Sequence, residues 1–191
     1  MKTTRLTLHT VCGLEEIPGH GARGVSHVLS ILDPGWPDPD FSGYGVYRRT
    51  TLRFHDAIAP GPGRVLPERA DVAAILAFGR AVSEETADEA HILVHCHLGL
   101  SRSTAALASL FAQAEPETPA GELVARLHAL RDGAWPNARM IGFADEALGR
   151  NGTLVEAVRR LHGLQLAKNP SLDPLMRRLD RAAEVEAAIM N

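Results

Sequence analysis

The sequence has little of what marks several classes of protein. It holds only two cysteines, Cys12 and Cys96, which lie far apart and offer no disulfide framework, so a reducing compartment is expected. No apolar run is long enough to cross a bilayer, and the first nine residues lack the apolar stretch of a signal peptide. The formal net charge of −3 gives no sign of nucleic-acid binding. We therefore expect a cytoplasmic protein without a nucleic-acid or membrane partner.

The apolar pattern that is present is typical of an α/β fold. Short apolar or alternating runs predict four strands, at 6–8, 27–32, 50–54 and 91–95. Apolar residues three or four apart predict helices at 72–82 and 105–114. Because strands alternate with helices, we expect a mainly parallel central sheet flanked by helices. With 191 residues, 45% of them hydrophobic, we expect a single domain over 1–191, with 152–191 as a helical C-terminal extension packed on it.

One thiol and one guanidinium stand where a strand leads through a short loop into a helix. Cys96 follows the apolar run 91–95, and Arg102 precedes the Ala/Leu-rich stretch 105–114. The five residues between them can curl so that their backbone N–H groups point inward and bind an anion. The helix N-terminus adds partial positive charge, and an arginine can hold two phosphate oxygens at once. A cysteine in such surroundings is typical of a phosphate-handling nucleophile.

This segment resembles the signature of the cysteine-dependent protein tyrosine phosphatases, and more closely that of the dual-specificity-phosphatase-like branch. The signature is His-Cys-x-x-Gly-x-Ser-Arg-Ser, and its fixed positions are matched by His95, Cys96, Gly99, Ser101, Arg102 and Ser103. A bare Cys-x5-Arg pattern is weak, but a full match between a strand and a helix is specific. The resemblance covers approximately residues 25–148. It implies hydrolysis of a phosphorylated protein or a small phosphomonoester, without a metal or other cofactor.

The resemblance also implies roles for the residues of the signature. Cys96 would attack phosphorus to form a phosphocysteine, while Arg102 and the loop amides would hold the equatorial oxygens. Ser103 would hydrogen-bond the sulfur and ease its departure, and His95 would orient the loop and support the thiolate. The residues expected to bind the phosphate are His97, Leu98, Gly99, Leu100, Ser101 and Arg102.

The general acid for the leaving oxygen has two candidates. Trp36-Pro37-Asp38 copies the acid loop of the larger tyrosine phosphatases, whereas Asp56 directly follows the third predicted strand. In the dual-specificity branch the acid loop follows the strand before the helix that leads to the cysteine strand, and only Asp56 has that place. Asp38 comes one strand too early, in proline-rich surroundings that are typical of a turn. We therefore expect Asp56 to be the acid and keep Asp38 as the alternative.

A further match lies downstream of the signature. Pro136-Asn137 with Met140 resembles the Pro-Asn-x-x-Phe segment of the dual-specificity enzymes, with methionine in place of phenylalanine. The resemblance implies that Asn137 braces the phosphate-binding loop from behind. Asn137 is equally well placed to be a plain helix N-cap, and one asparagine can serve both purposes.

The C-terminal segments lie outside the resemblance. Thr153 and Glu156 have the spacing of a capping box, and Gly163 stands just past the expected end of that helix. An apolar stripe at helical spacing follows, formed by Leu172, Leu175, Met176, Leu179, Ala183 and Met190. Such stripes mostly dock on their own domain, and a dimer or partner contact is the alternative. The oligomeric state stays open.

Other functions share parts of this pattern. A pseudophosphatase would keep the loop and bind phosphorylated partners without turnover. A phosphoinositide phosphatase would use the same chemistry, although such loops tend to carry lysines where this one has His97, Leu98 and Leu100. A sulfurtransferase also places a cysteine on an anion-binding loop, but the Ser-Arg-Ser run and a candidate acid argue against it.

The histidines around Cys96 suggest one more class, a metal site. His91, His95 and His97 together with the thiolate are good zinc or copper ligands. Successive strand residues point to opposite faces, however, so Cys96 cannot easily join its two neighbouring histidines around one ion.

Substrate cues outside the loop allow two interpretations each. Arg48, Arg49 and Arg53 could attract an acidic substrate or form a solvated strand face. Trp36 and Trp135 could wall the pocket by stacking on an aromatic ring, or cover the core.

Overall fold

The computed structural model describes residues 6–85 and 89–190. At its centre is a four-stranded sheet in the order β1 (Leu6–Cys12), β4 (Glu89–His95), β2 (His27–Leu32) and β3 (Arg48–Arg53). Every neighbouring pair of strands is parallel, so the predicted α/β class with a mainly parallel sheet is confirmed. β3 begins earlier than the expected run 50–54, because its pairing with β2 starts at Arg48 opposite His27.

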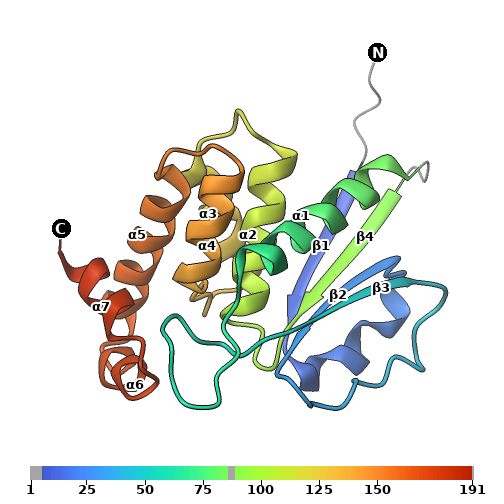
Figure 1. The fold of residues 1–191 in the computed structure, drawn as a ribbon. Coiled ribbons are helices and arrows are strands. Elements are labelled where there is room, and N and C mark those ends of the chain that lie inside the picture. Colours follow the sequence, from blue (N-terminus) through green and yellow to red (C-terminus); the bar gives the residue numbers. More distant parts are fainter. Residues whose placement is uncertain (1–5, 86–88, 191) are drawn as a thin grey trace.

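Helices cover the sheet on both faces and continue beyond it. A 3₁₀ helix, η1 (Leu14–Arg23), follows β1. The α-helices are α1 (Arg69–Glu84), α2 (Arg102–Ala114), α3 (Ala120–Leu130), α4 (Ala138–Ala147), α5 (Thr153–Lys168), α6 (Leu172–Arg178) and α7 (Ala182–Ile189). Figure 1 shows α2 to α5 gathered on one side of the strands, with η1 on the other side and α6 and α7 beyond α5.

Alternating side chains of the central strands supply two separate cores. Ile92 and Val94 of β4 belong to the large cluster under α1 and α2, whereas Leu93 belongs to a smaller cluster with Ile17 of η1 and Phe41. This period of two is what a strand covered on both faces requires. The second half of β4 is therefore packed on both faces up to its carboxyl end.

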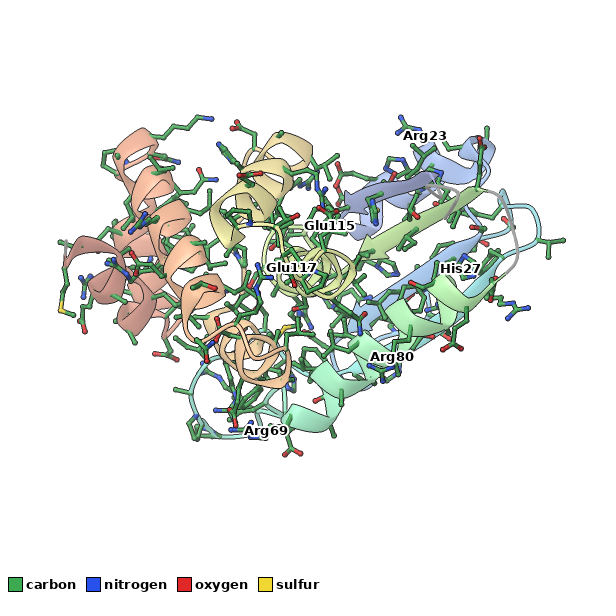
Figure 2. The ribbon with its side chains drawn as sticks, turned by 90° about the horizontal axis from the view of Figure 1, so that it is seen from above. Arg23, His27, Arg69, Arg80, Glu115 and Glu117 are labelled. Carbon is green, nitrogen blue, oxygen red and sulfur yellow. The ribbon has the colours of Figure 1, made fainter. Side chains whose placement is uncertain are left out.

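α1 runs along the sheet and is anchored to it at the end of the helix. In Figure 2, seen from above, Arg69 marks the start of α1 and Arg80 its second half, and His27 lies at the start of β2 beyond them. His27 Nε2 lies 2.9 Å from the carboxylate of Glu85, the residue directly after α1. This contact ties the C-terminal end of α1 to the start of β2.

The C-terminal helices differ from the sequence expectation in two respects. α5 does not end before Gly163 but continues to Lys168. A Cβ at Gly163 would lie 3.3 Å from the carbonyl oxygen of Ala188, so this glycine permits the close approach of α7. The apolar stripe over 172–190 is not one helix, because the helical conformation is interrupted at Asp180, whose φ is +57°.

No helix in the described part of the chain combines the length and the apolar character that crossing a membrane would take.

Candidate active site

The site lies at the carboxyl end of β4, between two neighbouring strands. The strand register sets His95 beside Cys12 of β1 and beside Ser30 of β2. The loop of residues 96–102, called the signature loop below, therefore leaves the sheet where two other strand ends and their loops can reach it. In parallel sheets this edge is where ligands bind.

Two glycines allow the signature loop to pack directly on the end of β1. Gly99 has a φ of +70°, and a Cβ there would collide with the backbone of Cys12. A Cβ on Gly13 would lie 2.9 Å from the carbonyl oxygen of His97. The Leu14 N–H donates to that same oxygen at 2.9 Å. A side chain at either glycine would therefore push the loop off its support.

The surrounding scaffold binds the carbonyl side of the loop. His97 O, Leu98 O, Leu100 O and Ser101 O accept hydrogen bonds from Leu14 N, Arg131 Nη2, Trp135 N and Thr104 Oγ1 respectively, at 2.8–2.9 Å. All peptide bonds in the described residues are trans, so the N–H of each of these peptides points opposite to its carbonyl. The N–H groups consequently face away from the scaffold, which is the arrangement of an anion-binding nest.

The two cysteines have different surroundings. The Cys96 sulfur lies 3.2 Å from Ser103 Oγ in the first turn of α2, so it sits beside a helix N-terminus. Cys12 is fully buried, and burial raises the pKa of its thiol to about 12. Cys12 therefore stays protonated at neutral pH, and it has the properties of a core residue.

The Arg102 guanidinium is held through one of its nitrogens. The side chain is only 4% exposed, and Nη1 donates to Asp33 Oδ1 at 2.5 Å and to Phe54 O at 2.6 Å. Its Nε is buried and has no hydrogen-bond partner among the described residues. A buried donor without an acceptor is rare in proteins. This nitrogen is thus a donor that an anion bound beside Arg102 would satisfy.

Asp33 was not among the residues predicted for the site. It directly follows β2, and its backbone N–H donates to His97 Nε2 at 3.2 Å. Burial, with help from the Arg102 charge, lowers the pKa of His97, so its ring is neutral and can accept this bond. The ring of Trp36 packs on His97 with 4.4 Å between centroids. The loop after β2 therefore forms one wall of the site.

His95 makes a polar contact with the neighbouring strand β2. Its Nε2 lies 2.6 Å from Ser30 Oγ, which also accepts a bond of 2.8 Å from Arg49 Nε. Because Arg49 fills one acceptor position of Ser30, the hydroxyl hydrogen is available to His95. Burial lowers the pKa of His95 to about 4, so the ring is neutral near pH 7. The contact fixes the residue that precedes Cys96.

The structure brings Asp56 to the signature loop. Asp56 Oδ1 accepts hydrogen bonds from Ser101 Oγ at 2.8 Å and from Asn137 Nδ2 at 2.9 Å. Asp38 instead pairs with Arg53 at 2.6 Å and with Arg49 at 3.2 Å. Of the two candidate acids, Asp56 is therefore the one that shares contacts with the loop of Cys96.

Those ion pairs also account for most of the basic cluster before Asp56. Arg49 and Arg53 pair with Asp38, and Arg48 pairs with Glu85 at 2.6 Å. Each arginine of β3 thus has a carboxylate partner within the chain, with Asp38 shared by two of them, which favours the interpretation of a solvated strand face.

Asn137 makes the contacts that both of the considered roles would need. Its Oδ1 accepts from Met140 N at the start of α4, which makes it the N-cap of that helix. Its Nδ2 donates to Asp56 Oδ1, and its backbone N–H donates to Ser101 O at 3.4 Å. The asparagine therefore connects α4 with Asp56 and with the signature loop.

Two arginines at the site were missed by the sequence reasoning. Arg131 donates to both carboxylate oxygens of Glu16, at 2.7 and 2.8 Å, and to Leu98 O at 2.9 Å. Arg181, from the C-terminal segment, donates to Ser101 Oγ at 2.8 Å. Neither stands near the signature in the sequence, and no local motif marks them.

The other singled-out residues lie apart from one another. His91 Nε2 contacts Thr10 Oγ1 at 2.8 Å, while His95 and His97 contact Ser30 and Asp33, so the three rings do not converge. No group of three metal-ligating side chains is found within residues 6–85 and 89–190. Trp135 is buried and stacks on His162 at 4.1 Å, so it belongs to the core, whereas Trp36 is 45% exposed.

Several solved structures are similar to this fold at low sequence identity. Human DUSP28 is similar with a TM-score of 0.55 and 17% identity, covering 75% of this chain and 94% of its own. The human tyrosine phosphatase-like serine/threonine/tyrosine-interacting protein is similar with a TM-score of 0.53 and 17% identity, covering 73% and 87%. PTPMT1 in complex with PI(5)P is similar with a TM-score of 0.50 and 13% identity, covering 78% and 94%.

These similarities confirm, at the level of fold, the resemblance that the signature implied. The chain has the fold of the dual-specificity and tyrosine phosphatase-like proteins. No protein-family model matches the sequence, and no curated protein matches it significantly.

Proposed function

We propose that this chain, which has the fold of the dual-specificity phosphatases, hydrolyses phosphomonoesters through a phosphocysteine on Cys96. Phosphotyrosine in proteins is the preferred substrate in this proposal, and a dual specificity is its wider form. The observation that carries it is the signature loop itself. Cys96 contacts Ser103, and Asp56 accepts a hydrogen bond from Ser101. Arg102 has a buried Nε that finds no partner among the described residues.

The reaction runs in two balanced steps. In the first, the Cys96 thiolate forms the S–P bond while the P–O bond to the leaving group breaks, and the proton of Asp56 moves to the departing oxygen. In the second, the Asp56 carboxylate takes a proton from water, whose oxygen bonds to phosphorus while the S–P bond breaks. Inorganic phosphate leaves, and the thiolate is restored with a hydrogen bond from Ser103.

The loop stabilises charge on the phosphoryl group in both steps. Its N–H groups and Arg102 donate to the equatorial oxygens, where negative charge spreads in the transition state. Asp33 and Phe54 O fix the guanidinium before substrate arrives. Such preorganisation lowers the barrier because no donor needs to turn during the reaction.

The rim of the site supports an aromatic leaving group. Trp36 is 45% exposed and packs on His97, and Leu98 is 71% exposed. Apolar and aromatic side chains at a rim suit the ring of a phosphotyrosine or another aryl phosphate. The loop has no lysine that would meet additional phosphates, so a phosphoinositide is the less favoured substrate.

A binding module is the second candidate function. One similar structure is named as a phosphatase-like interacting protein, and the fold by itself does not separate catalysis from binding. Both the thiol and a carboxylic acid are present in this chain, which favours turnover.

The test is hydrolysis of an aryl phosphate in excess chelator, with and without vanadate. We expect wild type to be active and blocked by vanadate, which mimics the transferring phosphoryl group. Cys96→Ser should lose activity, whereas Cys12→Ser, at the buried thiol, should keep it in the folded protein.

Other outcomes would identify the alternatives. Binding of vanadate or phosphotyrosine without turnover would support the binding module. Activity that disappears in chelator alone would contradict the metal-independent mechanism. Faster turnover of a phosphoinositide than of a phosphotyrosine peptide would overturn the substrate preference.

A further inference from the structure

The turn between α6 and α7 brings an arginine to the candidate acid. Arg181 follows Asp180, where the chain turns sharply between the two helices. Arg181 Nη1 lies 2.8 Å from Ser101 Oγ and 3.3 Å from Asp56 Oδ2. Because Ser101 Oγ donates in turn to Asp56 Oδ1, the three side chains form a closed triangle beside the signature loop.

Glu184 fixes the rest of the guanidinium. Arg181 Nε and Nη2 donate to its two carboxylate oxygens at 2.7 and 2.8 Å, a bidentate geometry. The same carboxylate accepts from Trp135 Nε1 at 2.7 Å and from Ala138 N at 2.9 Å. Those two residues flank the asparagine that also holds the acid. The guanidinium therefore has one orientation, set by groups that belong to the site.

The Arg181 charge is permanent although the side chain is only 4% exposed. Burial by itself lowers the pKa of Arg181, but the charges of Asp56 and Glu184 outweigh it, and the pKa is raised.

A second ion pair joins the same two segments. Arg64 lies in the loop that follows Asp56, and it pairs with Asp180 at 2.5 Å. Figure 1 shows this loop, drawn in teal, extending toward α6. The acid loop and the α6–α7 turn are thus connected at the adjacent residues Asp180 and Arg181.

Stability alone gives little reason for a buried cation here. Removing charges from water is costly, and apolar residues of similar volume often stabilise a core as well or better. A reacting carboxylate, by contrast, has to be held within about half an ångström of its working position. Oδ1 of Asp56 is held by Ser101 and Asn137, and Oδ2 by Arg181, so Arg181 decides how the carboxylate is rotated.

We propose that Arg181 is a positioning residue for the general acid, and that the α6–α7 segment is part of the catalytic apparatus. This inference rests on the proposed function, because Arg181 acts through Asp56. Its three guanidinium nitrogens are all engaged by protein groups, so it is not a ligand of the substrate phosphate.

The test compares two leaving groups in the full chain. We expect Arg181→Met to lower kcat/KM about 10–100-fold for phenyl phosphate, whose leaving oxygen needs a proton. For 2,4-dinitrophenyl phosphate, whose leaving group departs without one, the loss should stay below about threefold. Arg181→Lys should recover part of the loss. Arg177→Met is the matched control, because Arg177 lies on the same segment and, within residues 6–85 and 89–190, its ion pairs are with Asp173 and Glu186. It should leave both rates unchanged.

A double-mutant cycle separates positioning from a general structural effect. In an Asp56→Asn background, Arg181→Met should change kcat/KM for phenyl phosphate less than about twofold, because the group it positions is gone. Equal losses on both leaving groups, or independent effects in the cycle, would overturn the inference. If Arg181→Met does not fold, as judged by circular dichroism, Arg181→Lys serves in the same comparison. A wild type without turnover would overturn the proposed function and this inference together, whereas an active wild type with equal losses would overturn this inference alone.

Discussion

The Arg102 guanidinium and the Asp56 carboxylate are held in opposite ways. Among the described residues, Arg102 is held through Nη1, and its buried Nε has no hydrogen-bond partner. Asp56 is contacted at both oxygens, which orients it but leaves the carboxylate 31% exposed. The first arrangement suits a group that must bind substrate, and the second suits a group that must meet an oxygen and a water in turn.

Replacing each of the two candidate acids in turn tests whether Asp56 is the general acid. We expect Asp56→Asn to lower turnover of phenyl phosphate about 100-fold or more, because the amide has no proton to give to the leaving oxygen. Asp38→Asn should change it less than about threefold, since Asp38 is 58% exposed and pairs with Arg49 and Arg53. Steady-state rates of both variants decide the matter. A large loss in Asp38→Asn with Asp56→Asn silent would reverse the assignment.

The sequence could predict those site residues that are neighbours in the chain. The residues from His95 to Ser103 lie on one strand–loop–helix unit, so their spacing alone places them together. Asp33, Arg131 and Arg181 reach the loop through ion pairs and hydrogen bonds that tertiary packing sets. The one available signal was for Asp33, which follows a strand predicted to lie in the same sheet.

At the scale of elements, the start of α5 shows why a local motif can mislead. Thr153 and Glu156 match a capping box, but Thr153 Oγ1 donates to Arg150 O. The helix start is capped instead by Asp145 of α4, which accepts from Gly152 N at 2.7 Å, Leu154 N at 2.9 Å and Val155 N at 3.3 Å. A residue on a preceding helix can supply a cap, and no pattern within α5 reveals it.

The two caps differ in the stability that they should provide. We expect Asp145→Ala to lower the free energy of unfolding by about 1–3 kcal/mol, because it leaves buried amides without an acceptor. Thr153→Ala, at an exposed position, should change it by less than about 0.5 kcal/mol. Urea denaturation at pH 7 measures both. Similar losses in the two variants would show that the local capping box contributes after all.

The strands were predictable because their burial leaves a pattern within the strand itself. Ile92, Leu93 and Val94 are buried on alternating faces, so a continuous apolar run marks the strand. The apolar stripe over 172–190 does not form one helix, because Asp180 has a positive φ and interrupts it. The resulting turn pairs with Arg64, which is distant in the sequence, so no local pattern reveals it.

At the scale of the whole molecule, three neutral histidines link stability to pH; two of them are buried and His9 is partly buried. Burial lowers the pKa of His9, His95 and His162 to about 4 each. In the unfolded chain they bind protons near pH 6.5, so the stability they contribute is present above that pH and is lost as pH falls toward 4. We expect the free energy of unfolding to drop between pH 7 and pH 5 by roughly 1–2 kcal/mol for each fully buried histidine.

Denaturant titrations at the two pH values check this expectation. His162→Gln should show a smaller drop than wild type, since one of the linked groups is gone. A free energy of unfolding that is independent of pH in this range would contradict the buried neutral state.

That residues 1–191 form a single domain remains a proposal, which a single cooperative transition in the same titrations would support.

The chain's two tryptophans both contact the signature loop, in different surroundings. Trp36 is half exposed against His97 of the signature loop, and Trp135 is buried against His162 and bonded to Glu184. The protein therefore carries two built-in optical reporters. We expect iodide quenching of the exposed indole to report whether the signature loop is occupied. We expect the blue-shifted emission of the buried indole to report whether the α6–α7 segment is docked. One unlabelled sample would then show both events.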